Sequence, residues 1–259
     1  MFFNNIYKRA KKLYFEITSA TNEKIKSAKK LLANGKEEGV MLVEGEKPVF
    51  DAIKNGLASV AVFCSKKTEK TDFIAKNHTV YFVPPFIMEK ITDTKTPQSL
   101  CMLAKRPEYT ESIKSGRWVL CENIQDPKNL GAMIRTADAV GLKGVLLLGN
   151  NADEFSPKAT RGAMGSNLYL PVLKLSYDEL KALKKDFALY ATVLDEKAVS
   201  LSEISFEENA IIAIGNEGQG LSEKLVSLCD KTVYIPMKGR AQSLNASVAA
   251  AIIMWEISK

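Results

Sequence analysis

Short apolar runs alternate with helix-like segments along this chain, and this alternation limits the folds that it can adopt. The run VMLVE at 40–44 has the length of a strand, and the helix predicted after it at 48–54 ends at Asn55-Gly56. The pattern repeats, with strands predicted at 59–63, 79–83 and 99–104 and helices at 69–76 and 86–91. A basic helix is predicted over 17–33. Strands that alternate with helices predict an α/β fold, with a parallel or mixed sheet covered by helices.

A second set of alternating elements follows a polar, proline-broken stretch at 107–116. It comprises predicted strands at 117–124, 144–149, 188–194, 210–215 and 232–236, and helices at 127–140, 177–184, 222–228 and 243–257. We therefore expect two α/β domains, 1–106 and 117–259, joined by a linker at 107–116. The closing helix has no polar residue from Val248 to Trp255, which predicts burial on most faces, in the core or in a subunit interface.

Positive charge is concentrated in the first of these domains. Lys and Arg outnumber Asp and Glu by 36 to 30 over 259 residues, but residues 1–106 hold 19 basic and 11 acidic side chains, against 17 and 19 in residues 107–259. Residues 1–36 alone carry 9 basic and 2 acidic side chains. This asymmetry predicts that the first domain binds a polyanion. The alternative is a solvated, lysine-rich helix face.

Composition and cysteine spacing exclude several classes of protein. A chain with 46% hydrophobic and 25% charged residues is typical of globular proteins, which excludes collagen-like, disordered and membrane-spanning chains. The four cysteines are widely spaced and the only histidine is His78, so we expect no metal site. Cysteines inside apolar runs indicate buried, reduced thiols, and the first residues lack the pattern of a signal peptide. We therefore expect a cytoplasmic protein.

Three polar, glycine-containing clusters follow predicted strands, where open α/β sheets bind their ligands. The general dinucleotide motif is absent, since GNEGQG at 215–220 does not match GxGxxG, and the sequence contains no P-loop motif GxxxxGK(S/T). In the first cluster, at 123–137, Asp126 is a predicted N-cap with Pro127 after it, which directs a helix N-terminus toward an anion. Arg135 is expected to reach across the gap at Gly131 toward Asn129. The alternative is a surface arginine paired with Asp138.

The other two clusters each lead from a strand into a helix. In the second, at 214–222, glycines let the backbone approach a ligand and Glu217 can accept a hydrogen bond, although a plain turn is the alternative. The third, at 235–247, enters the closing helix, with Ser243 as its predicted N-cap. Asn245 and Ser247 then fall in the first turn of that helix, where burial is costly unless they form hydrogen bonds.

Together the motifs NxGxxxRTA, IGNEGxG and IPM with SLNxS resemble the three signature motifs of the SpoU (TrmH-type) RNA ribose 2′-O-methyltransferases of the SPOUT superfamily. The first domain resembles the L30e-like substrate-binding domain of that family, through ITSATNEKIKSAKKL, VMLVEGEKPVFDAI and TPQSLCMLAKRP. This resemblance covers nearly the whole chain. One departure is Ala246, where many members have Val, and we expect it only to adjust packing.

The resemblance implies a C-terminal domain with a deep trefoil knot, an S-adenosylmethionine cofactor, an RNA substrate and a homodimer. Family roles place main-chain groups of Gly215, Ile235 and Leu244 against the cofactor. The other implied cofactor-binding residues are Leu194, Asn216, Glu217, Gly220, Met237 and Ser243. Arg135, Asn129 and Asn245 match residues with substrate and catalytic roles. We expect Arg135 to orient a substrate phosphate, and its action as a base remains a hypothesis because free arginine stays protonated.

If the substrate is RNA, basic side chains are the expected phosphate contacts, and the domain organisation favours rRNA over tRNA by family habit. The predicted RNA-binding residues are Lys24, Lys26, Lys29, Lys30, Arg106 and Arg161, with Lys8, Arg9, Lys11, Lys12 and Lys105 as further candidates. Four alternatives stay open: a tRNA 2′-O-methyltransferase, an rRNA methyltransferase of the antibiotic-resistance type, a catalytically silent RNA-binding homologue and a small-molecule methyltransferase. The last would have no use for a basic domain.

Overall fold

The chain divides into two compact units, Met1–Arg106 and Pro107–Lys259. The computed structural model describes residues 13–34, 39–92, 94, 96–110, 112–195, 197–241 and 243–259. Lys8, Arg9, Lys11 and Lys12, proposed above as RNA contacts, lie outside these residues. Residues of the predicted linker group with the second unit, where the Tyr109 hydroxyl donates to the carbonyl of Asn167 at 2.8 Å.

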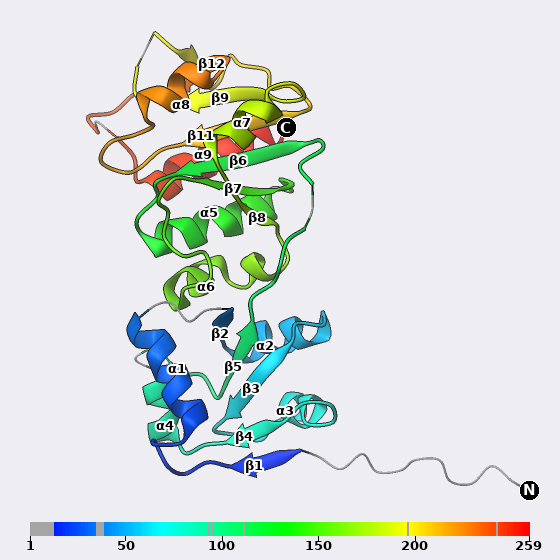
Figure 1. The fold of residues 1–259 in the computed structure, drawn as a ribbon. Helices are drawn as coiled ribbons and strands as arrows, with labels where there is room; N and C mark the ends of the chain where they lie inside the picture. The colour runs from blue at the N-terminus through cyan, green and yellow to red at the C-terminus, as the bar shows by residue number, and fades with distance from the viewer. Residues whose placement is uncertain are drawn as a thin grey trace, which may run out of the picture. The chain divides into compact units, whose positions relative to one another are not determined.

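The first unit is a five-stranded mixed sheet with helices on both faces (Figure 1). The strands lie in the order β1-β4-β3-β5-β2, with β5 antiparallel to both β3 and β2. The elements are β1 (Tyr14–Glu16), α1 (Glu23–Asn34), β2 (Val40–Glu44), α2 (Glu46–Lys54), β3 (Ser59–Cys64), α3 (Glu69–Ile74), β4 (Val80–Phe82), α4 (Pro85–Ile91) and β5 (Leu100–Lys105).

Two helices cover each face of this sheet (Figure 1). Helices α1 and α4 pack on one face, where Ile25 and Leu31 meet Ile87 and the buried ring of Phe63. Helices α2 and α3 cover the other face. The apolar positions of α1 recur at helical spacing, which leaves its lysines on the remaining surface.

The second unit is a seven-stranded parallel sheet in the order β10-β12-β9-β11-β6-β7-β8. Its elements are β6 (Arg117–Glu122), α5 (Pro127–Ala139), β7 (Gly144–Leu148), α6 (Pro157–Ala163), the 3-10 helix η1 (Ser166–Leu168), β8 (Val172–Leu175), α7 (Tyr177–Leu183), β9 (Ala188–Thr192), β10 (Val199–Ser200), β11 (Ala210–Ile214), α8 (Glu223–Leu228), β12 (Lys231–Tyr234) and α9 (Ala246–Ile257).

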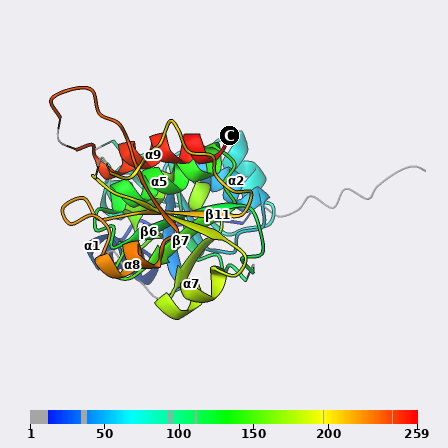
Figure 2. The ribbon, with the colours of Figure 1, turned by 90° about the horizontal axis from the view of Figure 1, so that it is seen from above.

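Both faces of this sheet are buried, as its near-continuous apolar strands predict. Helices α5 and α9 lie on one face and α7 and α8 on the other (Figure 2). Along β6 the side chains alternate, so that Val119 and Cys121 join the α5/α9 core while Trp118 and Leu120 join the α7/α8 core. No helix among the described residues is both long and apolar enough to span a bilayer.

Several short elements were missing from the sequence prediction: β1, α6, η1, β8 and β10. The sequence PKATRGA of α6 shows no apolar stripe because this helix packs on α5 through its backbone. A Cβ at Gly131 of α5 would lie 2.3 Å from the carbonyl oxygen of Ala159, so the two helices approach more closely than larger side chains allow. Hydrophobic periodicity cannot detect such a contact.

Two expectations about helix ends were wrong. Helix α1 begins at Glu23, because the side chain of Asn22 accepts a hydrogen bond from Lys24 N at 3.0 Å and ends the preceding turn. Helix α9 begins at Ala246 with Asn245, and not Ser243, as its N-cap. The oxygen of Asn245 accepts from the backbone N–H groups of Ser247 and Val248, which explains how a polar residue is satisfied at the start of an apolar helix.

Helix α9 is less buried than its composition predicts. Ala250, Ile253, Met254 and Ile257 face the core, but Val248, Ile252 and Trp255 form an exposed stripe at helical spacing. Trp255 keeps 61% of its surface exposed. The sequence could not decide between a core helix and an interface helix, and the structure shows one face of α9 in the core and an opposite apolar face exposed.

Candidate active site

Three loops meet at the carboxyl edge of the parallel sheet of the second unit. They follow β6, β11 and β12, and each corresponds to one of the three polar clusters in the sequence. A pocket of about 390 Å³ lies here, lined by the ends of β9, β11 and β12, by the loops after them and by the first turns of α9. All nine predicted cofactor-binding residues line it: Leu194, Gly215, Asn216, Glu217, Gly220, Ile235, Met237, Ser243 and Leu244.

The glycine loop after β11 is held in one shape by its own backbone. Asn216 and Gly220 exchange two backbone hydrogen bonds, of 3.1 and 2.9 Å, and the Asn216 side chain accepts from Gly218 N at 2.8 Å. A Cβ on Gly215 would lie 2.2 Å from the carbonyl carbon of Gly220. Only glycine therefore fits at the point where the loop closes on itself.

The glycine loop is also tied to the loop after β6. The Asn216 amide donates to the carbonyl of Asn123 at 2.9 Å. Asn123 has a φ of 57°, in the left-handed region, and its side chain accepts from Asn150 N at 2.7 Å. Asn123 belongs to the first cluster, but its part in joining three loops was not predicted from the sequence.

Two of the predicted catalytic residues meet beside the pocket, and the third does not. Asn129, in the first turn of α5, donates from Nδ2 to Glu217 Oε1 at 2.6 Å. Asn245 Nδ2 donates to Asn129 Oδ1 at 3.3 Å. One residue from each cluster thus contributes to a line of polar side chains at the surface, in which a carboxylate polarises two amides.

Arg135 lies apart from this line. It is exposed, and among the described residues it has no ion pair or hydrogen bond with Asn129 or Asp138. At about 100° per residue, Arg135 lies roughly 120° around α5 from Asn129. The expected gap beside Gly131 is filled by the backbone of α6, so the prediction that Arg135 reaches across it was wrong. The carboxylate of Asp138 accepts instead from the hydroxyl of Ser166 at 2.6 Å.

A buried carboxylate, absent from the sequence prediction, supports the pocket from behind. Glu122, the last residue of β6, accepts from both the backbone N–H and the hydroxyl of Ser222 at 2.7 Å, and from the hydroxyl of Tyr177. Ser222 is the N-cap of α8, directly after the glycine loop. Burial, followed by the hydrogen bond to Glu122, raises the pKa of Tyr177. Glu122 lay inside a predicted strand. The signal that could have identified it was its charge at the end of an otherwise apolar strand.

The predicted RNA-binding residues occupy several elements. Lys24, Lys26, Lys29 and Lys30 all lie on α1, and Lys26 pairs with Glu23 at 2.7 Å on its surface. Arg106, at the end of the first unit, donates from Nε to the carbonyl of Val40 at 3.0 Å, so part of its guanidinium serves the fold. Arg161 lies in the last turn of α6. In the described parts of the chain, no three His, Cys, Asp or Glu side chains gather as metal ligands do.

Comparison with known proteins identifies the family of this chain. Residues 116–255 match the SpoU rRNA Methylase family, and residues 22–102 match the MRM3-like substrate binding domain. The 23S rRNA (guanosine(2553)-2′-O)-methyltransferase RlmP of Bacillus subtilis is 36% identical over 249 residues, which cover 93% of this chain and 98% of that protein. The 23S rRNA (uridine(2479)-2′-O)-methyltransferase of Streptomyces viridochromogenes is 28% identical, over 84% of this chain and 82% of that protein.

The solved structures agree with these relatives. The AdoMet-bound rRNA methyltransferase from Sinorhizobium meliloti superposes with a TM-score of 0.84 at 27% identity, over 95% of this chain and 97% of that one. The family match, the relatives and the solved structure thus agree with the resemblance carried by the three motifs. This chain therefore belongs to the SpoU rRNA methylase family, with an MRM3-like substrate binding domain in its first unit.

Proposed function

We propose that this protein transfers a methyl group from S-adenosylmethionine to a ribose 2′-hydroxyl of 23S rRNA. The observation that carries the proposal is the pocket formed by the second and third motifs, with the Asn245–Asn129–Glu217 line beside it. Two relatives that match over most of their length are named as 23S rRNA 2′-O-methyltransferases, while others of similar coverage are named only as tRNA/rRNA methyltransferases. The first two differ in the nucleotide that they modify, and RlmP, the more similar of the two, acts on a guanosine.

The pocket fits the cofactor. Its volume of about 390 Å³ lies within the range of small-molecule sites. The glycine loop at 215–220 lines one side of the pocket, while Ile214, Leu244 and Ile253 supply apolar walls suited to a neutral base. Main-chain groups of Gly215, Ile235 and Leu244 would hold the cofactor, with Glu217 as the acidic residue of the lining. When bound, S-adenosylmethionine supplies a methyl group on a sulfonium, activated toward a nucleophile.

The polar residues beside the pocket are suited to orient the acceptor ribose. Asn129 and Asn245 offer amide donors and acceptors at the surface, and Glu217 keeps the Asn129 amide in one orientation. Direct alignment of the ribose hydroxyl accounts for a large part of the rate in such a transfer. Arg135, on an exposed side of α5, would bind a phosphate of the RNA and so help to position the acceptor nucleotide.

In this proposal the first unit binds the RNA substrate. It matches a substrate binding domain and carries most of the positive charge of the chain. Phosphate contacts from Lys24, Lys26, Lys29, Lys30 and Arg106, with Arg161 in the second unit, would make binding salt-dependent. If one of these lysines is replaced, we expect RNA binding to weaken at physiological salt and to recover at low salt.

We also propose a homodimer in which a second copy covers the exposed stripe of α9. Val248, Ile252 and Trp255 form a continuous apolar face, and patches of this kind on otherwise polar surfaces mark protein interfaces. Replacing Trp255 with Glu should convert a dimer to a monomer in light scattering after gel filtration. An unchanged mass would contradict the proposal, and the Val60→Glu variant, at an exposed apolar residue of the first unit, serves as the control.

Two finer features complete the proposal. We infer a trefoil knot in the second unit, supported by the position of α9, which follows the last strand yet packs on α5 near the start of this unit. We infer a cytoplasmic location from the thiol chemistry: Cys64, Cys101 and Cys121 are buried as free cysteines, and burial raises the pKa of each thiol.

The test is methyl transfer to rRNA from cells that lack this gene. Labelled S-adenosylmethionine is added with total rRNA, or separately with tRNA, and the product is mapped by the block that a 2′-O-methyl group places on alkaline cleavage. We expect signal at one ribose of 23S rRNA and none in an otherwise identical fragment with a 2′-deoxy residue at that position. Binding of S-adenosylmethionine without transfer to any rRNA would contradict the proposed substrate.

A further inference from the structure

Three aromatic rings form a row across the sheet of the first unit. Phe63 on β3 is fully buried, Tyr81 on β4 is partly buried, and Phe15 on the edge strand β1 is 54% exposed. The ring centroids are 5.9 Å apart from Phe63 to Tyr81 and 6.2 Å apart from Tyr81 to Phe15. Phe15 and Tyr81 are register partners in neighbouring strands, so both project from the same face. The row thus runs from the core to an open edge and ends in an accessible ring.

Positive charge lies beside this open end. Lys24, in the first turn of α1, places its Nζ 5.3 Å from the centre of the Tyr81 ring. The same helix carries Lys26, Lys29 and Lys30 against one acidic residue, Glu23. The neighbouring Glu16 projects from the opposite face of β1, since side chains alternate along a strand. The face that presents Phe15 is therefore both aromatic and cationic.

This combination matches the chemistry of an unpaired nucleotide. A base offers a flat π-face that stacks on an aromatic ring whatever its sequence, and the phosphates on either side attract lysines. We propose that Phe15, backed by Tyr81, is a stacking site for an unpaired base of the RNA substrate, with Lys24 and the other lysines of α1 on the flanking phosphates. This inference rests on the proposed function, because it takes the RNA substrate from there.

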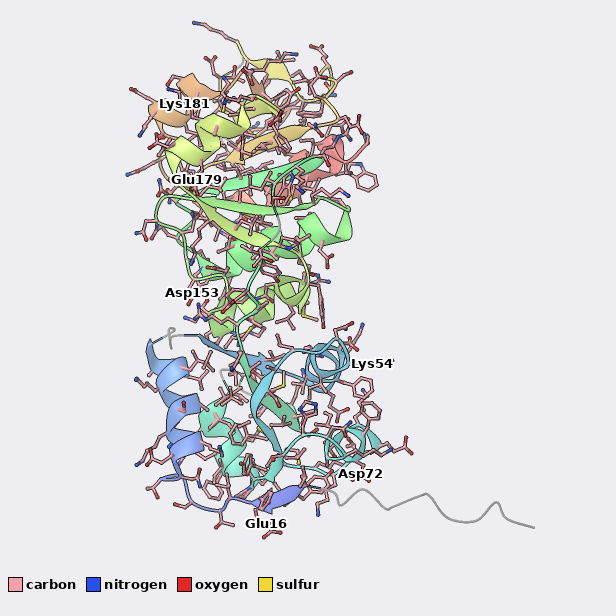
Figure 3. All side chains as sticks on the ribbon, turned by 45° about the vertical axis from the view of Figure 1, so that its right-hand side comes forward. Glu16, Lys54, Asp72, Asp153, Glu179 and Lys181 are labelled. Atoms are coloured by element: carbon pink, nitrogen blue, oxygen red, sulfur yellow. The ribbon has the colours of Figure 1, made fainter. Side chains whose placement is uncertain are left out.

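The other face of the same sheet offers a matched comparison. Phe73 on α3 is 44% exposed, packs 5.3 Å from the ring of Phe50, and has Lys76 Nζ 5.9 Å from its centre. Figure 3 labels Asp72 on α3 and Lys54 on α2, and both lie on the side of the sheet away from α1. Helix α3 carries Glu69 and Asp72 against Lys70, a net charge of −1, whereas α1 carries four lysines against one glutamate, a net charge of +3, so α3 attracts phosphates less than α1 does. Phe73 therefore controls for the loss of an exposed aromatic ring next to a lysine.

The test compares Phe15→Ala with Phe73→Ala in the full-length protein, with a 23S rRNA fragment as the probe. We expect Phe15→Ala to raise the Kd for the fragment, and the KM for methyl transfer, about 10-fold, with unchanged kcat and unchanged affinity for S-adenosylmethionine. Phe73→Ala should stay within about twofold of the wild type. Phe15→Leu should behave like Phe15→Ala, because stacking needs a π-face and not only apolar surface.

Tryptophan variants provide a direct readout of stacking that does not need the alanine variant to fold. Phe15→Trp should keep RNA affinity, and its fluorescence should be quenched on addition of the fragment, whereas Phe73→Trp should show no added quenching over the native tryptophans. Equal RNA affinity of Phe15→Ala and Phe73→Ala, or equal quenching of the two tryptophan variants, would overturn the stacking site.

The two proposals fail in different ways. If the wild type methylates rRNA and the Phe15 variants match their Phe73 controls, the stacking site is wrong and the proposed function stands. If the wild type binds the fragment through Phe15 but transfers no methyl group to any rRNA, the proposed function is wrong and the stacking site stands.

Discussion

Replacing Gly215 with Ala tests whether the closed glycine loop shapes the cofactor pocket. The added Cβ would lie 2.2 Å from the carbonyl carbon of Gly220, 2.3 Å from Leu221 N and 2.4 Å from the Gly220 oxygen. All three are backbone atoms, so no change of rotamer can relieve the contact. The loop must open, which separates Asn216 from Gly220 and draws the Asn216 amide away from Asn123.

The size of the effect follows from these contacts. Overpacking of this kind costs about 1–3 kcal/mol. Weakening one or two hydrogen bonds of the loop adds about 1 kcal/mol. Because the loop lines the pocket, we expect most of this cost, about 2–4 kcal/mol in all, to appear as affinity for S-adenosylmethionine that is roughly 30-fold to 700-fold weaker.

Isothermal titration calorimetry with S-adenosylmethionine measures this loss, with Gly218→Ala as the matched control. A Cβ on Gly218 would meet only the Asn216 side-chain oxygen, at 3.5 Å, which is ordinary contact, so its affinity should stay within about twofold of the wild type. Thermal unfolding of both variants shows whether the fold is intact. A Gly215→Ala protein that binds the cofactor within about threefold of the wild type would refute the reasoning.

Three further predictions concern other groups. Arg135→Lys should lower kcat about 100-fold with unchanged cofactor affinity, because lysine cannot present the planar fork of arginine to a phosphate; full activity in a methyl-transfer assay would remove Arg135 from the mechanism. Asn245→Asp keeps the oxygen that caps α9 but loses the amide donor to Asn129, so Tm should change little while activity falls about 10-fold; unchanged activity would leave Asn245 only its capping role. Burial raises the pKa of Cys64 to about 11 and that of Cys121 to about 12 from 9.0, so the thiols of the unfolded chain ionise first. The contribution of these thiols to the free energy of unfolding should therefore be fully present below pH 9, and the free energy of unfolding, from urea titrations, should fall as pH rises toward 11 and 12. Equal values at pH 8 and 10.5 would contradict this.

Local pattern was sufficient for most strands and for the residues around the pocket. The strand predicted at 210–215 corresponds to β11, because a parallel strand buried on both faces is a nearly continuous apolar run. The three polar clusters were visible for the same reason, since each interrupts the apolar pattern directly after such a strand. Glycines and short polar side chains at these points mark turns and ligand contacts whatever the rest of the fold.

Contacts that depend on backbone packing were not visible in the sequence. Gly131 suggested an open space for Arg135, but the tertiary structure fills that space with α6, whose own sequence carries no apolar stripe. Ser243 and Asn245 are both good capping residues, and propensity alone does not choose between them. The hydrogen bonds of Asn245 to the first turn of α9 decide the choice.

Some properties of this protein depend only on residues close together in the sequence, and local sequence is enough to predict them. These are the order of elements, the excess of positive charge and the motifs. The line from Asn245 through Asn129 to Glu217 joins residues 116 and 88 positions apart. These residues meet because β11 lies between β9 and β6 in the sheet and α9 returns to pack on α5. Contacts at that separation depend on strand order and helix packing. Only the tertiary structure could therefore show that Arg135 lies outside this line and that Glu122 lies behind the pocket.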